Sequence, residues 1–310
     1  MKLNQSRREF LKVSSSALAL ATLAPSSFAV EIVPAKKRPL KKGFMMSAFP
    51  KGERDLSWLE KFQMLKAAGF DGAEPPSHLN PKEILKAREA TGLAIASVVA
   101  GPHTRAMSAA VPSVRSKGAE GLKQALRDAK VYGASSVLCV AGHVDENASY
   151  AETWDRTREE IGKCIPLAES LGVKIAVENV WNNFLLSPLE AVRYVDEFNS
   201  TAVGWHFDVG NVIATGWPEQ WIQILGQRIQ KVHIKEFSRK KMNEEGLRKG
   251  FAVEYLEGDN DWPAVMKAFD EIGYNGWCIV EPACGPCQEK LSPEEFLKKV
   301  SADLDKILAS

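Results

Sequence analysis

Four apolar runs of this chain end in side chains that can bind a metal ion or move a proton. The ends read Ala176-Val177-Glu178, His206-Phe207-Asp208, Val232-His233-Ile234 and Ile279-Val280-Glu281. Three carboxylates and one imidazole would surround a cation with mostly oxygen ligands. We therefore expect one divalent metal ion, Mn²⁺ or Mg²⁺, with Co²⁺ and Zn²⁺ as alternatives. A single carboxylate at a strand end is more often a helix cap or an ion-pair partner, but three carboxylates and a histidine on consecutive runs are harder to explain in that way.

The elements that must position these residues alternate in type. From residue 43 onward, short β-rich runs alternate with longer segments of helical period, which is typical of parallel βα units. The expected strands are Phe44–Phe49, Phe70–Glu74, Ala94–Gly101, Ser135–Gly142, Val173–Val180, Val203–Val209, Lys231–Phe237 and Trp277–Glu281. The expected helices are Leu56–Gly69, Pro81–Gly92, Ser113–Gly133, Tyr150–Gly172, Pro188–Phe198, Glu219–Arg228, Trp262–Tyr274 and Pro293–Ala309.

Eight strands that are each followed by a helix predict an α/β fold, a closed (β/α)₈ TIM barrel in a single domain over residues 43–310. An open doubly wound sheet is the alternative, but no glycine-rich phosphate loop follows the first run. In a TIM barrel the active site lies at the carboxyl ends of the strands. The four metal-binding candidates should therefore meet at one rim.

A series of motifs in this order resembles the xylose-isomerase-like barrel superfamily of sugar (phosphate) isomerases and epimerases. The motifs are Val177-Glu178-Asn179, Phe207-Asp208-Val209-Gly210-Asn211, Val232-His233-Ile234-Lys235, Glu257-Gly258-Asp259-Asn260-Asp261-Trp262 and Ile279-Val280-Glu281, and the resemblance covers about residues 43–308. It implies that Glu178, Asp208, His233 and Glu281 are the metal ligands. It also implies that Glu178 and Glu281 are the catalytic acid and base, on opposite faces of the substrate.

Elementary chemistry supports this double role for Glu178 and Glu281. Removal of a proton beside a sugar carbonyl produces an enediolate, whose charge a cation stabilises as a Lewis acid. One carboxylate could then take a proton from one face while the other returns a proton to the opposite face. The predicted function is thus a metal-dependent isomerase or epimerase of a sugar or keto-sugar.

The chain departs from the related epimerases of free ketohexoses at two positions. They carry a histidine where this chain has Asn211, and a glutamate where it has Phe184. A neutral amide and an aromatic ring imply other substrate contacts, so ketohexose specificity does not transfer directly.

Further side chains are expected to contact a carbohydrate. His78, His103 and His143 follow the second, third and fourth runs, and Lys235 lies two residues beyond His233. Asn211 and Trp181 complete the predicted substrate-binding set, and either Trp181 or Phe184 could instead belong to the core. His206 should lie deeper on the interior face than Asp208. The long stretch from Ser238 to Asp261 could form a lid, and its Arg239-Lys240-Lys241 run could meet a phosphate or remain a solvated surface.

The first residues resemble a twin-arginine export signal. Arg7-Arg8 precedes a modest apolar run and a small-x-small site that ends at Ala29, and residues 30–42 are expected to be an exposed linker. The prediction is export by the twin-arginine translocase to the periplasm or the extracellular space. The apolar run is too short to span a bilayer, so we expect no stable membrane anchor.

Composition weighs against a nucleic-acid partner. The 310 residues include 40 Lys and Arg against 39 Asp and Glu. Residues 1–29 hold four of the basic residues and one acidic residue, which leaves 36 basic against 38 acidic residues, a net charge of −2. A slightly acidic body gives no general attraction to a phosphate backbone. The sequence leaves homo-oligomer formation open.

The five cysteines cannot all pair within one chain. Cys139 and Cys278 lie in apolar runs and are expected in the core, and Cys164 falls in a helical stretch. Cys284-Gly285-Pro286-Cys287 has the spacing of a redox dithiol, but a βαβ context is missing because only 23 residues follow it. A loop disulfide or free thiols are the favoured interpretation.

Three other functions compete with the isomerase. A lyase could use the same metal site for β-elimination on a 3-keto-glycoside. Endonuclease IV resembles this barrel but needs further histidine ligands and a basic DNA surface, and Asn211 replaces one of its histidines. A non-catalytic sugar-binding barrel is the remaining alternative, which turnover of a panel of keto-sugars by the metal-loaded protein would exclude.

Overall fold

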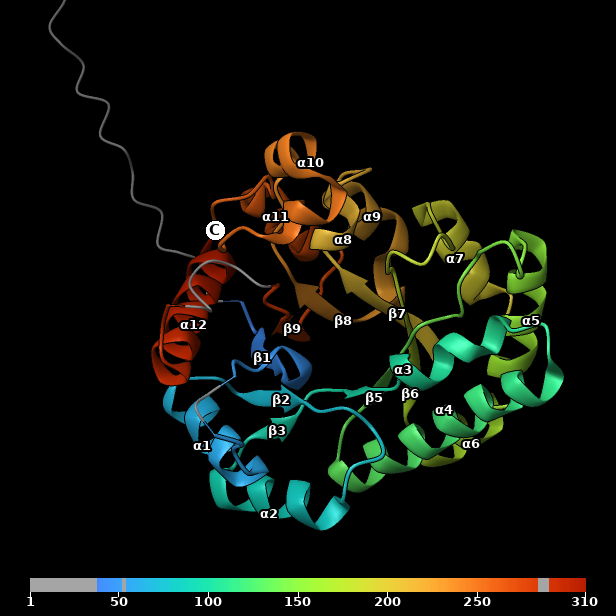
Figure 1. Cartoon of the computed structure of the whole chain (residues 1–310), viewed down its shortest axis with the longest axis horizontal. Coiled ribbons are helices and arrows are strands. Elements are labelled where there is room, and N and C mark those ends of the chain that lie inside the picture. Colours follow the sequence, from blue (N-terminus) through green and yellow to red (C-terminus); the bar gives the residue numbers. More distant parts are fainter. Residues whose placement is uncertain (1–37, 52–53, 284–289) are drawn as a thin grey trace, which may run out of the picture. The chain divides into compact units, whose positions relative to one another are not determined.

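The computed structural model describes residues 38–51, 54–283 and 290–310, which contain nine parallel strands. Their order in the sheet is β3-β2-β1-β9-β8-β7-β6-β5-β4, and the helices surround them (Figure 1). The strands are β1 (Lys41–Met45), β2 (Gly72–Glu74), β3 (Ala94–Ile95), β4 (Val98–Val99), β5 (Ser136–Cys139), β6 (Lys174–Glu178), β7 (Val203–Asp208), β8 (Ile229–Ile234) and β9 (Trp277–Val280).

The two ends of this sheet are successive pieces of one chain segment, which closes the barrel. β3 pairs with β2, and β4, only two residues later, pairs with β5. A parallel bridge between Pro76 and Val99 also links the chain after β2 to β4. The predicted TIM barrel is therefore confirmed. Its third predicted strand appears as two short strands because the segment changes its hydrogen-bonding partner from β2 to β5 midway.

The helices form the outer layer around the strands (Figure 1). They are α1 (Trp58–Ala67), α2 (Pro81–Thr91), α3 (Gly101–Thr104), α4 (Pro112–Tyr132), α5 (Tyr150–Gly162), α6 (Ile165–Leu171), α7 (Pro188–Asp196), α8 (Gly210–Ile213), α9 (Pro218–Leu225), α10 (Arg239–Glu245), α11 (Trp262–Glu271) and α12 (Pro293–Ala309). Short 3₁₀ helices are η1 (Met46–Ala48), η2 (Arg105–Ser108), η3 (Gly226–Arg228) and η4 (Leu247–Phe251).

Local sequence explains where several helices begin and end. α1, α5, α7 and α12 each start with a capping box, in which a serine and a glutamate three residues later exchange hydrogen bonds with the backbone. α2 and α4 end at Gly92 and Gly133, which adopt the left-handed conformation with φ of 68° and 78°. The segment predicted as one helix over 150–172 is two helices, α5 and α6. Pro166 has no N–H to donate to the carbonyl of Gly162, and its ring crowds that carbonyl.

The main core lies between the strands and the outer helices, and Cys139, Cys164 and Cys278 are buried there as free cysteines. A separate, smaller apolar cluster comprises Val99, Leu138 and Val140, with Met45 and Val180 packed against it. The Cys284-Cys287 pair lies outside the described residues, as do the leader and most of the linker. Strand β1 starts at Lys41, two residues before the predicted start of the barrel domain.

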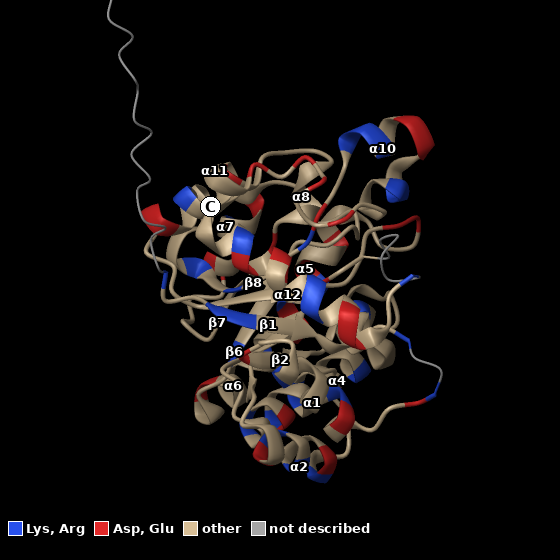
Figure 2. Ribbon diagram, turned by 90° about the vertical axis from the view of Figure 1, so that its left-hand side faces the viewer, with Lys and Arg blue, Asp and Glu red and all other residues tan. Residues whose placement is uncertain are grey.

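Charges of both signs are mixed along the outer helices (Figure 2). α10, for example, begins with Arg239-Lys240-Lys241 and ends with Glu244-Glu245. Among the described residues, no helix is long and apolar enough to cross a bilayer.

Candidate metal centre in the barrel

Strands β6 to β9 bring the four predicted ligands together. Glu178 ends β6, Asp208 ends β7, His233 lies in β8 and Glu281 directly follows β9. Each offers one donor atom, and these atoms all lie within 4.8 Å of one another. The parallel register produces this proximity, because Asp208 pairs with His233 across β7 and β8.

His233 and Lys235 hold the three carboxylates in place. Nδ1 of His233 lies 3.1 Å from Oε1 of Glu178 and 3.1 Å from Oε2 of Glu281. Nζ of Lys235 lies 3.1 Å from Oδ2 of Asp208 and 2.8 Å from Oε2 of Glu281. Glu178 and Glu281 therefore share His233 as a partner, and Asp208 and Glu281 share Lys235, which brings the three carboxylates together.

The carboxylates crowd negative charge into a dry site. Burial raises the pKa of Glu178, and it raises the pKa of Asp208 to about 7, with the Glu281 and Glu178 carboxylates adding to the shift. A divalent cation would relieve that crowding. Ligands about 2.0–2.4 Å from a cation can lie no more than about twice that distance apart. The four donor atoms meet this limit, so the residues fit the metal ion that the sequence predicts.

Glu178 and Glu281 experience opposite electrostatic environments. Burial alone would raise the pKa of Glu281, but the Lys235 ammonium and the hydrogen bond to His233 outweigh it and hold this pKa below its ordinary value. The pKa of Glu178 is raised. Two neighbouring carboxyl groups whose pKa values are pushed apart are suited to separate acid and base roles.

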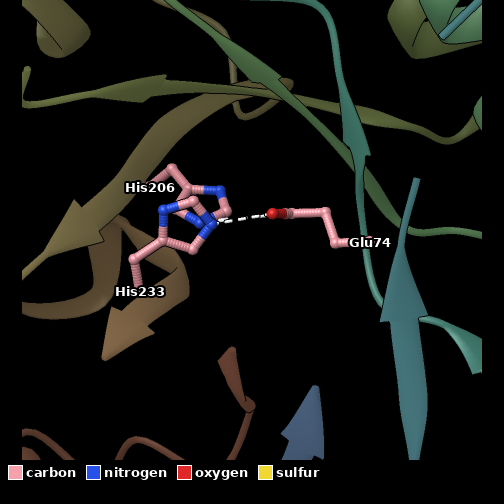
Figure 3. A group of neighbouring side chains, drawn as sticks. All are labelled: Glu74, His206 and His233. Atoms are coloured by element: carbon pink, nitrogen blue, oxygen red, sulfur yellow. Dashed lines mark hydrogen bonds and ion pairs between the residues drawn. The ribbon is translucent and has the colours of Figure 1, made fainter. Parts of the chain in front are cut away.

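A further carboxylate, Glu74 at the end of β2, contacts the ring nitrogen of His233 that does not face Glu178 and Glu281. It is fully buried, and its Oε2 lies 2.7 Å from Nε2 of His233 (Figure 3). Although burial would lower it, the carboxylates of Glu74, Glu178 and Glu281 raise the pKa of His233 well above its ordinary value, so both ring nitrogens donate. With a cation bound, Nε2–H would still donate to Glu74 and Nδ1 would be the metal ligand. Glu74 was not among the predicted ligands, although it ends the second predicted strand, and Glu178 lies near the end of the fifth.

His206 lies deeper than Asp208, as strand alternation predicts, and faces Glu74 together with His233 (Figure 3). Its Nε2 is 3.9 Å from Oε1 of Glu74, and its ring packs edge-on against His233 with centroids 4.2 Å apart. Burial lowers the pKa of His206 well below its usual range, so the imidazole is neutral. Glu74, His206 and His233 form a second group of potential metal donors within 4.8 Å.

Asn179, the residue after Glu178, fixes the position of Asp208. Its Oδ1 accepts hydrogen bonds from the backbone N–H of Asp208 at 3.0 Å and from Nε1 of Trp205 at 3.1 Å. Its Nδ2 donates to the backbone carbonyl of Asp208 at 2.7 Å. One buried amide thus ties the end of β6 to the end of β7.

The carboxylates border a cavity of about 760 Å³, called the central cavity below. Glu178, Lys235 and Glu281 line its polar side, and the smaller apolar cluster lines the other side. Its other lining residues are Ser47, Pro76, Gly101, Pro102, Arg105, Trp181, Asn211, Arg248, Phe251 and Ala283. The cavity therefore offers charged groups to one part of a ligand and apolar contact to another.

Three of the predicted substrate-binding residues line this cavity, namely Trp181, Asn211 and Lys235. Nε1 of Trp181 donates to the backbone carbonyl of Asn211 at 2.9 Å. The backbone N–H of Asn211 donates to Oδ1 of Asp208 at 2.8 Å. Phe184, by contrast, is buried in the core against Tyr150 and Tyr194.

The three other histidines lie elsewhere, and none of them lines the central cavity. The rings of His78 and His103 stack on each other with centroids 3.8 Å apart. Nε2 of His143 lies 2.8 Å from Oδ2 of Asp145. Their predicted contact with substrate stays a prediction. In this structure the backbone N–H of His78 donates to Asp128 of α4, and the backbone N–H of His143 donates to Oγ of Ser108 in η2.

The segment predicted as a lid is folded, and it makes contacts with neighbouring loops and rings that hold it in place. Its Ser238–Asp261 stretch contains α10 and η4, and Phe251 packs against Trp181 with ring centroids 4.7 Å apart. Arg239 donates to the backbone carbonyls of Ile213 and Gly216, both at 2.9 Å. Arg239 is therefore engaged in structural hydrogen bonds.

Comparison with known proteins finds relatives with the same type of barrel. A family model described as "Xylose isomerase-like TIM barrel" matches residues 62–300. L-ribulose-5-phosphate 3-epimerase UlaE from Escherichia coli (strain K12) is 25% identical over 261 residues, covering 79% of this chain and 87% of the relative. Inosose dehydratase from Clostridium perfringens (strain 13 / Type A) is 25% identical over 165 residues, 48% of this chain. That match spans about half of the dehydratase, 55% of its length.

Solved structures share the barrel at low sequence identity. An L-ribulose 3-epimerase superposes with a TM-score of 0.71 at 20% identity, covering 87% of this chain and 94% of the other. The 3-keto-D-glucoside 4-epimerase YcjR from E. coli gives 0.70 at 17% identity, covering 87% and 100%. The IOLI protein with a bound zinc atom gives 0.71 at 16% identity, covering 87% and 98%.

Proposed function

The chain belongs to the xylose isomerase-like TIM barrel family, and from that premise we propose that it is a metal-dependent isomerase or epimerase of a sugar or keto-sugar. The observation that carries the proposal is the position of Glu178 and Glu281. Both line the central cavity, and both lie 3.1 Å from the same atom, Nδ1 of His233. Two carboxyl groups at one end of a cavity, with oppositely shifted pKa values, provide an acid and a base for one substrate.

Glu178, Asp208, His233 and Glu281 would hold the cation, which when bound supplies Lewis-acid stabilisation of negative charge on the substrate oxygens. Glu178 and Glu281 take up and return the proton at the carbon beside the carbonyl, so that the substrate passes through an enediolate. Lys235 balances the charge of Asp208 and Glu281. The smaller apolar cluster lines the central cavity and can contact the carbon chain of the substrate.

The names of the relatives agree with this class of reaction. UlaE is described as an epimerase of a sugar phosphate, and two of the superposed structures are described as epimerases of a sugar and of a 3-keto-glucoside. A lyase acting by β-elimination on a 3-keto-glycoside is the second candidate, and the observation that favours it is the dehydratase among the matched relatives. Both candidates begin with loss of a proton beside a carbonyl, so the released product distinguishes them.

Solvent proton exchange tests the proposal. The protein, loaded with Mn²⁺, Mg²⁺, Co²⁺ or Zn²⁺ in turn, is incubated in heavy water with ketoses and 3-keto-glycosides, and deuterium at carbon is measured by mass spectrometry. We expect exchange with at least one substrate and loss of exchange in Glu178→Gln.

Glu160→Gln is the matched control, because Glu160 is also a buried glutamate but lies on the outer helix α5. Absence of exchange across all metals and substrates would contradict the proposal. So would wild-type exchange in Glu178→Gln.

We also propose that the protein is exported after folding. The Arg7-Arg8 pair, the following apolar run and the small residues up to Ala29 support this, and they lie outside the described residues. Export by the twin-arginine translocase would allow the metal to be acquired before translocation. It would also favour unphosphorylated sugars or glycosides as substrates.

A further inference from the structure

A second pocket, called the side pocket below, adjoins the central cavity. It measures about 340 Å³ and lies between the loop after β6, the segment around α8, and η4. Four residues line both spaces: Val180, Trp181, Asn211 and Arg248. The remaining lining residues are Asn179, Asn183, Leu185, Leu186, Val212, Ala214, Thr215, Trp221 and Leu247. A molecule bound at the carboxylates would have this pocket beside it.

The side pocket has an apolar wall that solvent reaches. Leu186 is 64% exposed and Leu247 is 57% exposed, although both are large apolar residues. They belong to different segments, the loop after β6 and η4, yet line the same pocket. Exposed apolar side chains that converge on a concave site are typical of ligand or partner binding.

The backbone of the same wall has an uncommon conformation. Asn183 and Leu185 both have positive φ, 59° and 55°. A leucine in the left-handed region is rare, and such strained residues cluster at functional sites. Leu185 is held there by packing and by a hydrogen bond from its N–H to the hydroxyl of Tyr150 at 3.0 Å.

We propose that the side pocket binds the apolar aglycone of a glycoside whose sugar ring occupies the central cavity. This inference rests on the proposed function, and it narrows the substrate class from sugars in general to glycosides with an apolar or aromatic substituent. The charged groups Glu178, Lys235 and Glu281 line only the central cavity. The side pocket has a larger apolar share, although Asn179, Asn183 and Thr215 add polar groups to its lining.

Size and chemistry agree with that occupant. An apolar cavity of roughly 150 Å³ is enough to bind benzene, so the side pocket has room for one or two rings. Trp181 and Arg248 line both spaces, and an indole face and a guanidinium can each stack on an aromatic ring. A free monosaccharide in the central cavity would leave Leu186 and Leu247 in water.

Matched substrates test this assignment in the metal-loaded, full-length protein. The methyl and phenyl glycosides of one 3-keto-hexose, in each anomeric form, are compared by the kcat/KM of deuterium exchange. We expect the phenyl glycoside to exceed the methyl glycoside by roughly 10- to 100-fold in one anomeric form, from the additional apolar area buried. Leu186→Ser and Leu247→Ser should each lower this ratio several-fold.

Leu189→Ser is the matched control. Leu189 is 69% exposed and lies three residues after Leu186, but it lines neither the side pocket nor the central cavity. The ratio should keep its wild-type value in this variant. Light scattering of all variants shows whether the apolar wall instead joins two copies of the chain.

The outcomes separate the two proposals. A phenyl-to-methyl ratio within about twofold of one in the wild type overturns the aglycone assignment but leaves the sugar chemistry intact. An unchanged ratio with an altered oligomeric state in Leu186→Ser and Leu247→Ser also overturns it. If no substrate is exchanged, the proposed function fails, and calorimetric titration with phenyl and methyl glucosides then decides the side pocket. Tighter binding of the phenyl glucoside than of the methyl glucoside, lost in Leu186→Ser, supports the aglycone assignment. Equal affinities for the two glucosides overturn it.

Discussion

Asn179→Ala should weaken the fold and the metal centre together. The substitution removes the partner of three groups on β7: the N–H and carbonyl of Asp208 and the indole N–H of Trp205. Leaving a buried polar group unpaired costs about 1–3 kcal/mol. With three groups left unpaired, the free energy of unfolding should fall by about 3–9 kcal/mol, a large share of the roughly 5–15 kcal/mol typical of folded proteins. Because Asp208 loses its anchor, affinity for Mn²⁺ should fall about 10- to 100-fold.

Urea unfolding and calorimetric titration with Mn²⁺ measure the two effects separately. The matched control is Asn182→Ala, since Asn182 is as buried as Asn179, at 6% exposure. Asn182 bonds the carbonyl of Gly142 at 2.9 Å and the N–H of Phe184 at 3.3 Å, neither of them on β7. The control should lose about 2–6 kcal/mol of stability and keep its affinity for Mn²⁺.

A less drastic variant keeps the test open if Asn179→Ala does not fold. Asn179→Asp retains an acceptor for the two N–H groups but loses the amide donor to the carbonyl of Asp208. Its stability and affinity should lie between those of Asn179→Ala and the wild type. If an Asn179 variant binds Mn²⁺ as tightly as Asn182→Ala does and loses a similar amount of stability, Asn179 does not position Asp208 for metal binding.

Three further predictions concern other parts of the molecule. Burial lowers the pKa of Lys231 to about 8 from the ordinary lysine value of 10.5. The charged amine therefore destabilises the folded state fully below pH 8, and this destabilisation decreases as the pH rises toward 10.5. Urea unfolding should find Lys231→Met more stable than the wild type at pH 7, by at most about 3 kcal/mol, with a smaller difference at pH 10; a less stable variant at pH 7 would contradict this. Glu236 accepts hydrogen bonds from Leu256 N–H at 2.9 Å and Trp262 Nε1 at 3.0 Å. Because these bonds hold the segment in place, Glu236→Gln should speed tryptic cleavage within residues 238–261. Unchanged digestion would show that other contacts hold the segment. Mass spectrometry of the exported protein should find that the chain begins after Ala29. A retained leader in the exported wild type would contradict the predicted cleavage. Arg7→Lys combined with Arg8→Lys should abolish export.

The candidate site was predictable to the extent that it follows strand ends. Glu281 ends a predicted strand, Glu178 and Asp208 lie within two residues of the end of one, and His233 lies within one. Closure of the barrel therefore had to bring them to one rim. Glu74 obeys the same rule and could have been found by it. The histidines after the second, third and fourth strands were placed by the same reasoning, yet none lines the central cavity, because loop residues are not fixed by strand register.

The alternation of short β-rich runs with longer segments of helical period predicted the TIM barrel from the sequence alone, because these signals depend on neighbours only a few residues away. Tertiary structure alone decided which side chains share a cavity. It placed Glu74 beneath His233, turned Phe184 into the core and set Leu186 beside Leu247. Contacts between residues so distant in the chain depend on the path of each loop, which local pattern does not specify.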